Sequence, residues 1–151
     1  MVSYTVTGTS DMAMSPVMAT ARTDDLWRHT CFEAFVRTGS GPSYYEFNFA
    51  PSTQWAAYRF SSYRNGIAAA EIGTPSIEVQ SDADRTTLRV SLALDRLPDL
   101  SCEASWRLGL SAVIEDQSGG MSYWALAHPP GKPDFHHADC FALELSAVVQ
   151  S

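Results

Sequence analysis

Two glutamates inside predicted strands are the side chains with the clearest chemical potential in this chain. Glu33 lies in the run TCFEAFVR and Glu46 in the run YYEFNFAP, and neither is at a turn. If these two strands pair, both carboxyl groups lie on one face of a sheet, where they could bind sugar hydroxyls or an ion. The alternative is that they form salt bridges with Arg28, Arg59 or Arg64 on a solvated face.

Paired carboxyl groups are also the catalytic groups of glycoside hydrolases, which need them about 5–10 Å apart. Nothing else in the chain supports that chemistry, because the Gly-x-Ser-x-Gly, phosphate-loop and dinucleotide motifs are absent. Cys31 follows His29 by two residues, as a nucleophile and its base on one strand face would, but a buried free cysteine is far more common. The sequence therefore predicts no catalytic residue.

Aromatic side chains are concentrated around these glutamates, since residues 27–63 hold eleven of the seventeen in the chain. Trp27, Trp55 and Trp124 are candidates for stacking on the C–H face of a sugar ring, although a single tryptophan is more often part of a core. Tyr58 shares the run WAAYRF with Trp55 and belongs to the same candidate surface. Trp106 begins an apolar strand and is predicted to be core.

A loop at residues 127–139 contains three prolines and three of the four histidines. His136 and His137 are adjacent, so an extended backbone would direct them to opposite sides and at most one would face a given site. Three interpretations stay open. The loop could supply a metal site together with Glu115 or Asp116. It could be a stiff connection that hydrogen-bonds to the end of the fold, or it could form the rim of a ligand pocket.

Composition limits the function further. The 151 residues fit one domain, 1–151, and the net charge of −7, with a single lysine, argues against nucleic acid and anionic membrane surfaces as partners. The N-terminus does not read as a signal peptide, and no apolar run approaches the length of a membrane span. Three cysteines without metal-type spacing favour a reducing, cytoplasmic compartment over a disulfide framework.

Short alternating runs separated by turns predict an all-β fold. Alternation places Cys31, Glu33 and Phe35 on one strand face, and it likewise separates Glu46 and Asn48 from the phenylalanines of their strand. The predicted strands are 3–7, 30–37, 44–49, 55–60, 76–81, 86–94, 106–115, 121–126 and 140–145, with one helical turn at 95–100. About nine strands with turns every eight to twelve residues are typical of an antiparallel β-sandwich.

Several sequence blocks resemble a known family. The blocks LWRHTCFE (26–33), YEFNFAP (45–51), SYWAL (122–126) and FALEL (141–145) are similar to strands of DOMON-like domains, and to carbohydrate-binding modules of the family-9 type. Together with PDFHH (133–137), they are similar to a bacterial subfamily of DOMON-like proteins. The resemblance covers nearly the whole chain from about residue 3, where members of the family usually have one more strand.

The resemblance implies a binding module without catalysis, for either a sugar or haem. Haem would need axial ligands, and the haem-binding members use Met and His. Met12, Met14, Met18 and Met121 are available here, but covalent attachment is excluded because no Cys-x-x-Cys-His motif is present. The leading expectation is a carbohydrate or similar small polar ligand, with no cofactor and no metal. The alternatives are a haem or redox module and a protein-interaction domain, with a homodimer through an unprotected edge strand.

These interpretations give a specific set of expected positions. The ligand-binding residues are predicted to be Trp27, Arg28, Glu33, Glu46, Asn48, Trp55, Tyr58, Arg64, Tyr123, Trp124, His128 and His137. Five of them, Arg28, Glu46, Arg64, Tyr123 and His137, are expected to converge at one side or end of the sandwich. The two sheets are expected to pack Phe32, Val36, Phe47, Leu108, Leu110 and Leu143 between them.

Overall fold

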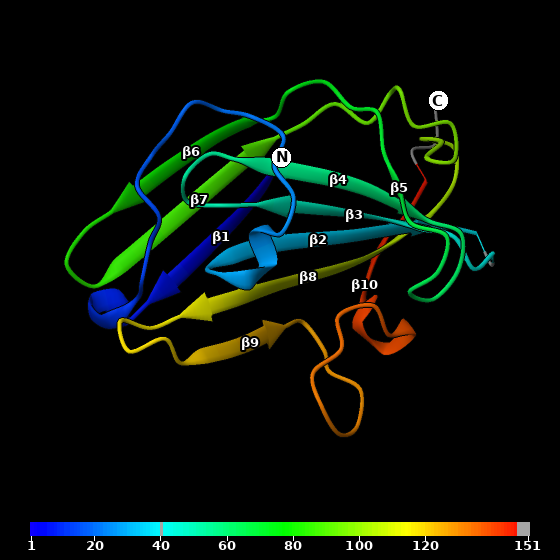
Figure 1. Ribbon diagram of the computed structural model, residues 1–151. Coiled ribbons are helices and arrows are strands. Elements are labelled where there is room, and N and C mark those ends of the chain that lie inside the picture. Colours follow the sequence, from blue (N-terminus) through cyan, green and yellow to red (C-terminus); the bar gives the residue numbers. More distant parts are fainter. Residues whose placement is uncertain (40, 148–151) are drawn as a thin grey trace.

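The computed structural model describes residues 1–39 and 41–147, which form two antiparallel sheets (Figure 1). The strands are β1 (Val2–Thr7), β2 (Cys31–Thr38), β3 (Tyr44–Phe49), β4 (Trp55–Phe60), β5 (Ala68–Ala69), β6 (Ser76–Ser81), β7 (Arg85–Ser91), β8 (Trp106–Glu115), β9 (Met121–Ala125) and β10 (Leu143–Leu145). Three 3-10 turns complete the elements: η1 (Thr9–Asp11), η2 (Leu26–Arg28) and η3 (Ala138–Cys140). The predicted all-β sandwich is confirmed.

The two sheets differ in size. The small sheet has the order β1-β7-β6, and the large sheet has the order β10-β8-β2-β3-β4-β5. β9 joins the large sheet beside the C-terminal half of β8, while β10 pairs with the N-terminal end of β8 on the same edge. The chain between β9 and β10 therefore leaves this edge and returns to it, as the orange loop of Figure 1 shows.

The main core lies between the two sheets. Phe32, Val36 and Phe47 of the large sheet are buried against Leu88 and Val90 of the small sheet. Because side chains alternate along a strand, one face of each strand supplies this core. Partly buried side chains of β8, Trp106, Leu108 and Leu110, pack against it, as the sequence predicted. The prediction for Leu143 is wrong: it is 40% exposed, because β10 is a three-residue edge strand.

The large sheet is also covered on its other face, which we call the outer face. All six residues of β3, and the first six of β2, are buried, although an antiparallel sheet usually buries one face. A second cluster covers this face, with Phe35, Tyr44 and Phe60 of the sheet packed on Phe135 and Phe141 of the loop after β9. η2 lies against β2 and β3 on the same face (Figure 1). These covering segments create the walls of the candidate site.

Four local predictions differ from the structure. The strand predicted at 86–94 ends at Ser91. Residues 140–145 do not form one strand, since Cys140 ends η3 and Phe141 packs inward before β10 begins. Residues 95–100 form successive turns, with the Leu97 N–H donating to the Leu94 carbonyl, rather than a helical turn. β5, which pairs with β4, was not predicted because two alanines carry no alternation. Within residues 1–39 and 41–147, no helix has the length and apolar character needed to cross a membrane.

Candidate ligand-binding cleft

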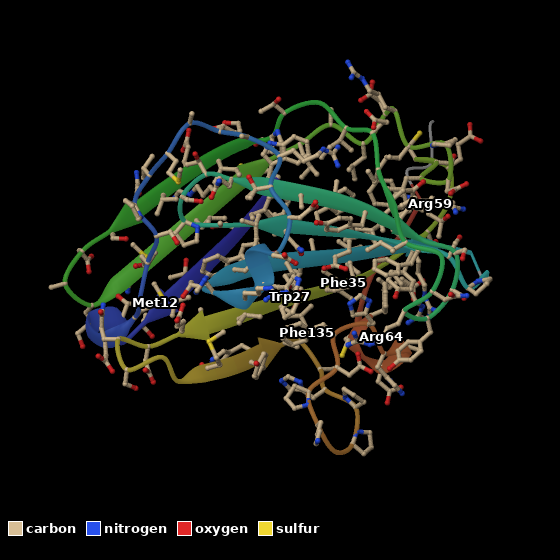
Figure 2. All side chains as sticks on the ribbon, in the orientation of Figure 1. Met12, Trp27, Phe35, Arg59, Arg64 and Phe135 are labelled. Carbon is tan, nitrogen blue, oxygen red and sulfur yellow. The ribbon has the colours of Figure 1, made fainter. Side chains whose placement is uncertain are left out.

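A cleft of about 760 Å³ opens on the outer face of the large sheet. Its floor is made by side chains of β2, β3, β4 and β8. Its walls come from the segment around η2, from the turn after β4, and from residues 133–136 of the loop after β9. Trp27, Arg64 and Phe135 represent these three walls around the sheet in Figure 2. A volume of this size is within the range of small-molecule pockets.

The strand register places the two glutamates side by side on the floor. Glu33 of β2 is opposite Asn48 of β3, and Glu46 of β3 is opposite Phe35 of β2, so the two carboxyl groups lie diagonally on adjacent strands. On the other side of Glu33 the register partner is Ser111 of β8. The pairing that the sequence analysis required is therefore present, and it puts both acids on one face. Their residues are 3% and 6% exposed, so they are not part of a solvated surface.

Burial controls the protonation of this pair. Desolvation raises the pKa of Glu33, and the nearby Glu46 raises it further. Desolvation also raises the pKa of Glu46. The neighbouring Ser111, Asn48 and Arg64 oppose these increases without cancelling them. The pair therefore retains a proton at a pH where exposed glutamates are fully ionised.

His136 lies beside Glu46 in a defined orientation. The backbone N–H of Arg64 donates to the Tyr44 hydroxyl at 3.1 Å, and the Tyr44 oxygen is 2.7 Å from Nδ1 of His136. We assign the ring proton to Nε2, because this tautomer lets the Tyr44 hydroxyl donate to Nδ1 and gives the ring N–H a carboxyl neighbour, Oε2 of Glu46 at 3.6 Å. Burial and the charge of Arg64 lower the pKa of His136 to about 4, so the ring is neutral at neutral pH.

An ion pair joins two walls of the cleft. Nη2 of Arg64 lies 2.7 Å from Oδ1 of Asp134, and the Tyr63 hydroxyl donates to the same carboxylate. Asp134 also accepts a hydrogen bond from the backbone N–H of His136 at 3.2 Å. Arg64 has a φ of 50°, in the left-handed region, where the tight turn before Gly66 requires it. This contact fixes the turn after β4 to the loop after β9.

The wall around η2 carries both acid and aromatic groups. The Tyr58 hydroxyl donates to Asp24 at 2.5 Å, and Asp25 lies 3.7 Å from Nε of Arg28. Trp27 is 51% exposed, and the Arg28 guanidinium lies 5.2 Å from the centre of its ring. This wall therefore presents an accessible indole beside the buried carboxyl groups.

The structure brings half of the predicted site residues together. The residues of that set that line the cleft are Trp27, Glu33, Glu46, Tyr58, Arg64 and Tyr123. Asn48 is buried on the floor beside Glu46. Arg28 lies behind the wall, paired with Asp25, so three of the five residues expected to converge, Glu46, Arg64 and Tyr123, do so.

Two predicted tryptophans face the other way, for a reason of alternation. Trp55 is buried in the core between the sheets, because residues 55 and 57 of β4 point inward while Tyr58 points into the cleft. Trp124 is opposite Ala112 of β8, whose side chain faces the main core, whereas Tyr123 is opposite the cleft residue Val113. Trp124 is exposed on the opposite side of the sheet edge from the cleft.

The two predicted loop histidines lie outside the cleft lining, and another takes their place. His128 packs against the ring of Phe135, and His137 caps η3 by accepting a hydrogen bond from the Asp139 N–H. His136 lines the cleft instead, so the expectation that at most one of the adjacent histidines faces the site holds. The alternative of a loop that rims the pocket is the one the geometry matches.

Several lining residues were not predicted from the sequence: Asp24, Asp25, Phe60, Ile67 and Val113. Residues 133–136 also line the cleft, and for them only the loop as a whole was expected at the rim. Phe60 lies two residues after Tyr58 on the same strand, so alternation places both on one face. Val113 is opposite Cys31, which shares a strand face with Glu33. Asp24 and Asp25 lie in an irregular segment, where no periodicity shows which way a side chain points.

The cleft does not fit haem, and no metal cluster is evident. No methionine contributes to the lining among the described residues, and both nitrogens of His136 are oriented by Tyr44 and Glu46. The carboxyl groups of the lining would also repel haem propionates. Across residues 1–39 and 41–147, no group of three or more His, Cys, Asp or Glu side chains has an arrangement that could hold a metal ion.

Comparison with known proteins gives no relative: no family model, no curated protein and no solved structure matches this chain. Its function is therefore argued from the cleft.

Proposed function

We propose that this protein is a non-catalytic binding module of the DOMON-like kind for a carbohydrate or a similar small polar ligand. The observation that carries the proposal is the open cleft, in which exposed Trp27 stands above the buried carboxyl groups of Glu33 and Glu46. An indole face suits the C–H face of a sugar ring, and buried carboxyl groups orient hydroxyl donors. Arg64 adds donors at the rim.

Two other interpretations have less support. A haem module needs free axial ligands and a lining that accepts propionates, but both nitrogens of His136 are engaged and the carboxyl groups of the lining would repel propionates. A pure protein-interaction domain would have a closed outer face, whereas this face has a cleft of about 760 Å³.

We also propose a reducing, cytoplasmic compartment for this protein. The proposal is supported by its three cysteines, which are all free thiols: Cys31 and Cys140 are buried, and Cys102 is exposed.

Tryptophan fluorescence tests the binding proposal. A panel of mono- and disaccharides, neutral, acidic and amino, is titrated against the wild type, Trp27→Ala and Trp124→Ala. Trp124 is the matched control because it is an exposed indole outside the cleft, at 64% exposure. We expect saturable binding to the wild type. Trp27→Ala should lower the affinity by about tenfold or more, since loss of a stacked aromatic costs roughly 1–3 kcal/mol, and Trp124→Ala should leave the affinity unchanged.

Two results would contradict the proposal. One is the absence of saturable binding across the panel when calorimetry is used as a second readout. The other is a response that is lost in Trp124→Ala and kept in Trp27→Ala, because it would locate binding on the opposite side of the sheet.

A further inference from the structure

The floor of the cleft offers hydrogen-bond acceptors in excess of donors. Glu33 and Glu46 both present carboxyl oxygens to the cleft. The His136 Nε2–H is a ring donor on this side, and it points at Glu46. A ligand group that meets this floor must therefore bring donors of its own.

Glu33 is a buried polar side chain that lacks a partner of normal geometry. It is 3% exposed and lines the cleft, and within residues 1–39 and 41–147 the neighbouring Ser111 hydroxyl is the one hydrogen-bonding side chain that acts on its carboxyl group. Ser111 lies next to it across the strands and lowers its pKa, but the Ser111 hydroxyl is itself buried without a hydrogen-bond partner of normal geometry. A buried carboxyl group in this condition is costly unless a donor or cation satisfies it.

The charge of the cleft favours a cation. Five carboxyl groups line it, from Asp24, Asp25, Glu33, Glu46 and Asp134, against the single guanidinium of Arg64. Arg64 is in contact with Asp134, and Asp25 has Arg28. Since His136 is neutral, Glu33 and Glu46 contact no cation in the described part of the chain.

The walls suit the carbon part of such a ligand. Trp27 and Tyr123 are 51% and 46% exposed, and Phe60 and Phe135 also line the cleft. Aromatic faces attract ammonium groups and the polarised C–H groups next to them. Trp27 already forms one cation–π contact, with the guanidinium of Arg28 5.2 Å from the centre of its ring.

We propose that the ligand of this cleft carries a protonated amine, as in an amino sugar, and that this ammonium group binds between Glu33 and Glu46 on the floor. An ammonium has three donors and no acceptor, which matches the four acceptor oxygens of two carboxyl groups that line the cleft. A neutral hydroxyl would bring one donor and no positive charge. The inference rests on the proposed function and specifies the class of its ligand.

Matched sugars separate the two proposals. Calorimetry measures the binding of glucosamine and galactosamine, of the neutral sugars glucose and galactose, and of the N-acetylated form of each amine. Each sugar is titrated into the wild type, Glu33→Gln and Glu144→Gln. Glu144 is the control because its carboxylate is on the surface, 3.2 Å from Nη2 of Arg107. We expect each amino sugar to bind about tenfold or more tightly than its N-acetylated form, because charge-assisted hydrogen bonds are the strong ones.

We expect Glu33→Gln to bring the ratio of the two affinities, for an amino sugar and for its N-acetylated form, close to one. Glu144→Gln should leave this ratio unchanged.

A second readout uses the wild type alone, so it remains valid if Glu33→Gln does not fold. An arriving ammonium displaces the proton that the glutamate pair retains, so binding should release protons, measured as a dependence of the binding enthalpy on buffer ionisation at pH 7. Spermidine tests whether an amine without a sugar suffices.

The outcomes differ for the two proposals. Equal affinity for neutral and amino sugars, with no proton release, would overturn the ammonium inference and leave the binding proposal standing. A preference for amines that persists in Glu33→Gln would overturn the assignment of the ammonium to this pair. No binding of any sugar or of spermidine would overturn both.

Discussion

At the scale of single residues, the cleft depends on groups that a sandwich core would not normally contain. Glu33, Glu46 and Asn48 are as buried as the phenylalanines around them. Their carboxyl and amide groups cost free energy unless protons or partners compensate. The retained proton, the neutral His136 and the Tyr44 hydroxyl together reduce that cost. The floor is therefore polar, buried and sensitive to pH.

The first prediction concerns Glu33 and pH. Its pKa is higher in the folded than in the unfolded chain, so the group favours folding at acidic pH and disfavours it as pH rises toward the folded pKa. Glu33→Gln should therefore gain stability relative to the wild type between about pH 5 and pH 8, by roughly 1–3 kcal/mol, since a pKa change of one is worth about 1.4 kcal/mol. Chemical denaturation at several pH values measures this difference.

Other groups that face Glu33 titrate too, and the comparison accounts for them. His136, with its pKa lowered to about 4, favours folding above its unfolded pKa and loses that contribution as pH falls, which is the opposite trend. It is present in both proteins, as are Glu46 and Arg64. At about pH 4, where Glu33 is protonated in both states, the two proteins should be nearly equal in stability. A stability difference that is constant with pH would show that the carboxyl group is ionised throughout.

At the scale of elements, the outer face is closed by segments that are not part of the sheet. η3 lies against β8 at Gly109, where an added Cβ would be 2.8 Å from the carbonyl oxygen of Cys140. The same segment carries Phe141 onto Phe35 and Tyr44. The position of the loop after β9, and with it the wall that holds His136, thus depends on a close approach that a glycine allows.

The second prediction tests this approach. Gly109→Ala should displace η3 from β8 and destabilise the protein by roughly 1–3 kcal/mol, as overpacking of a well-filled site does. It should also weaken ligand binding in the cleft, because residues 133–136 precede η3 directly. Gly73→Ala is the matched control, since an added Cβ there meets nothing within 4 Å. Thermal unfolding and the fluorescence titration give both readouts, and equal behaviour of the two variants would contradict the proposed dependence.

At the scale of the whole molecule, the cleft joins parts that are distant in sequence. Asp25 and Trp27 come before β2, Arg64 follows β4, and Asp134 and His136 come after β9. One ligand would therefore contact three separate segments laid over the same sheet. Occupation of the cleft should stabilise the native state as a unit rather than one loop.

The third prediction follows from this arrangement. A saturating ligand should raise the free energy of unfolding by about 2.7 kcal/mol at a hundred times its Kd. Amide hydrogen exchange should slow together in residues 23–28, 62–67 and 133–136, with no change in the β6–β7 hairpin of the small sheet. Protection of one of these three segments alone would show that the ligand binds at the rim rather than across the cleft.

The sequence by itself determined most of the strands, and the two faces of β2 and β3. Alternation in residues 31–36 and 44–49 separates Glu33 and Glu46 from the core residues Phe32, Phe47 and Phe49, and the structure has both sets on the faces expected. Trp55 and Tyr58 are three residues apart on one strand, so alternation places them on opposite faces. With Tyr58 in the cleft, the same rule assigns Trp55 to the core. Alternation is local and strong, because a shift by one residue would move the glutamates into the core between the sheets and the phenylalanines of that core onto the outer face.

Only the tertiary structure decided what covers the outer face and which groups meet there. Irregular segments have no period, so no pattern could show that Asp24, Asp134 and His136 face Glu33 and Glu46, or that His137 caps η3. Their positions come from contacts between segments, such as Arg64 with Asp134 and Tyr44 with His136. The protonation of the glutamate pair has the same origin, because it depends on burial by those segments rather than on the residues themselves.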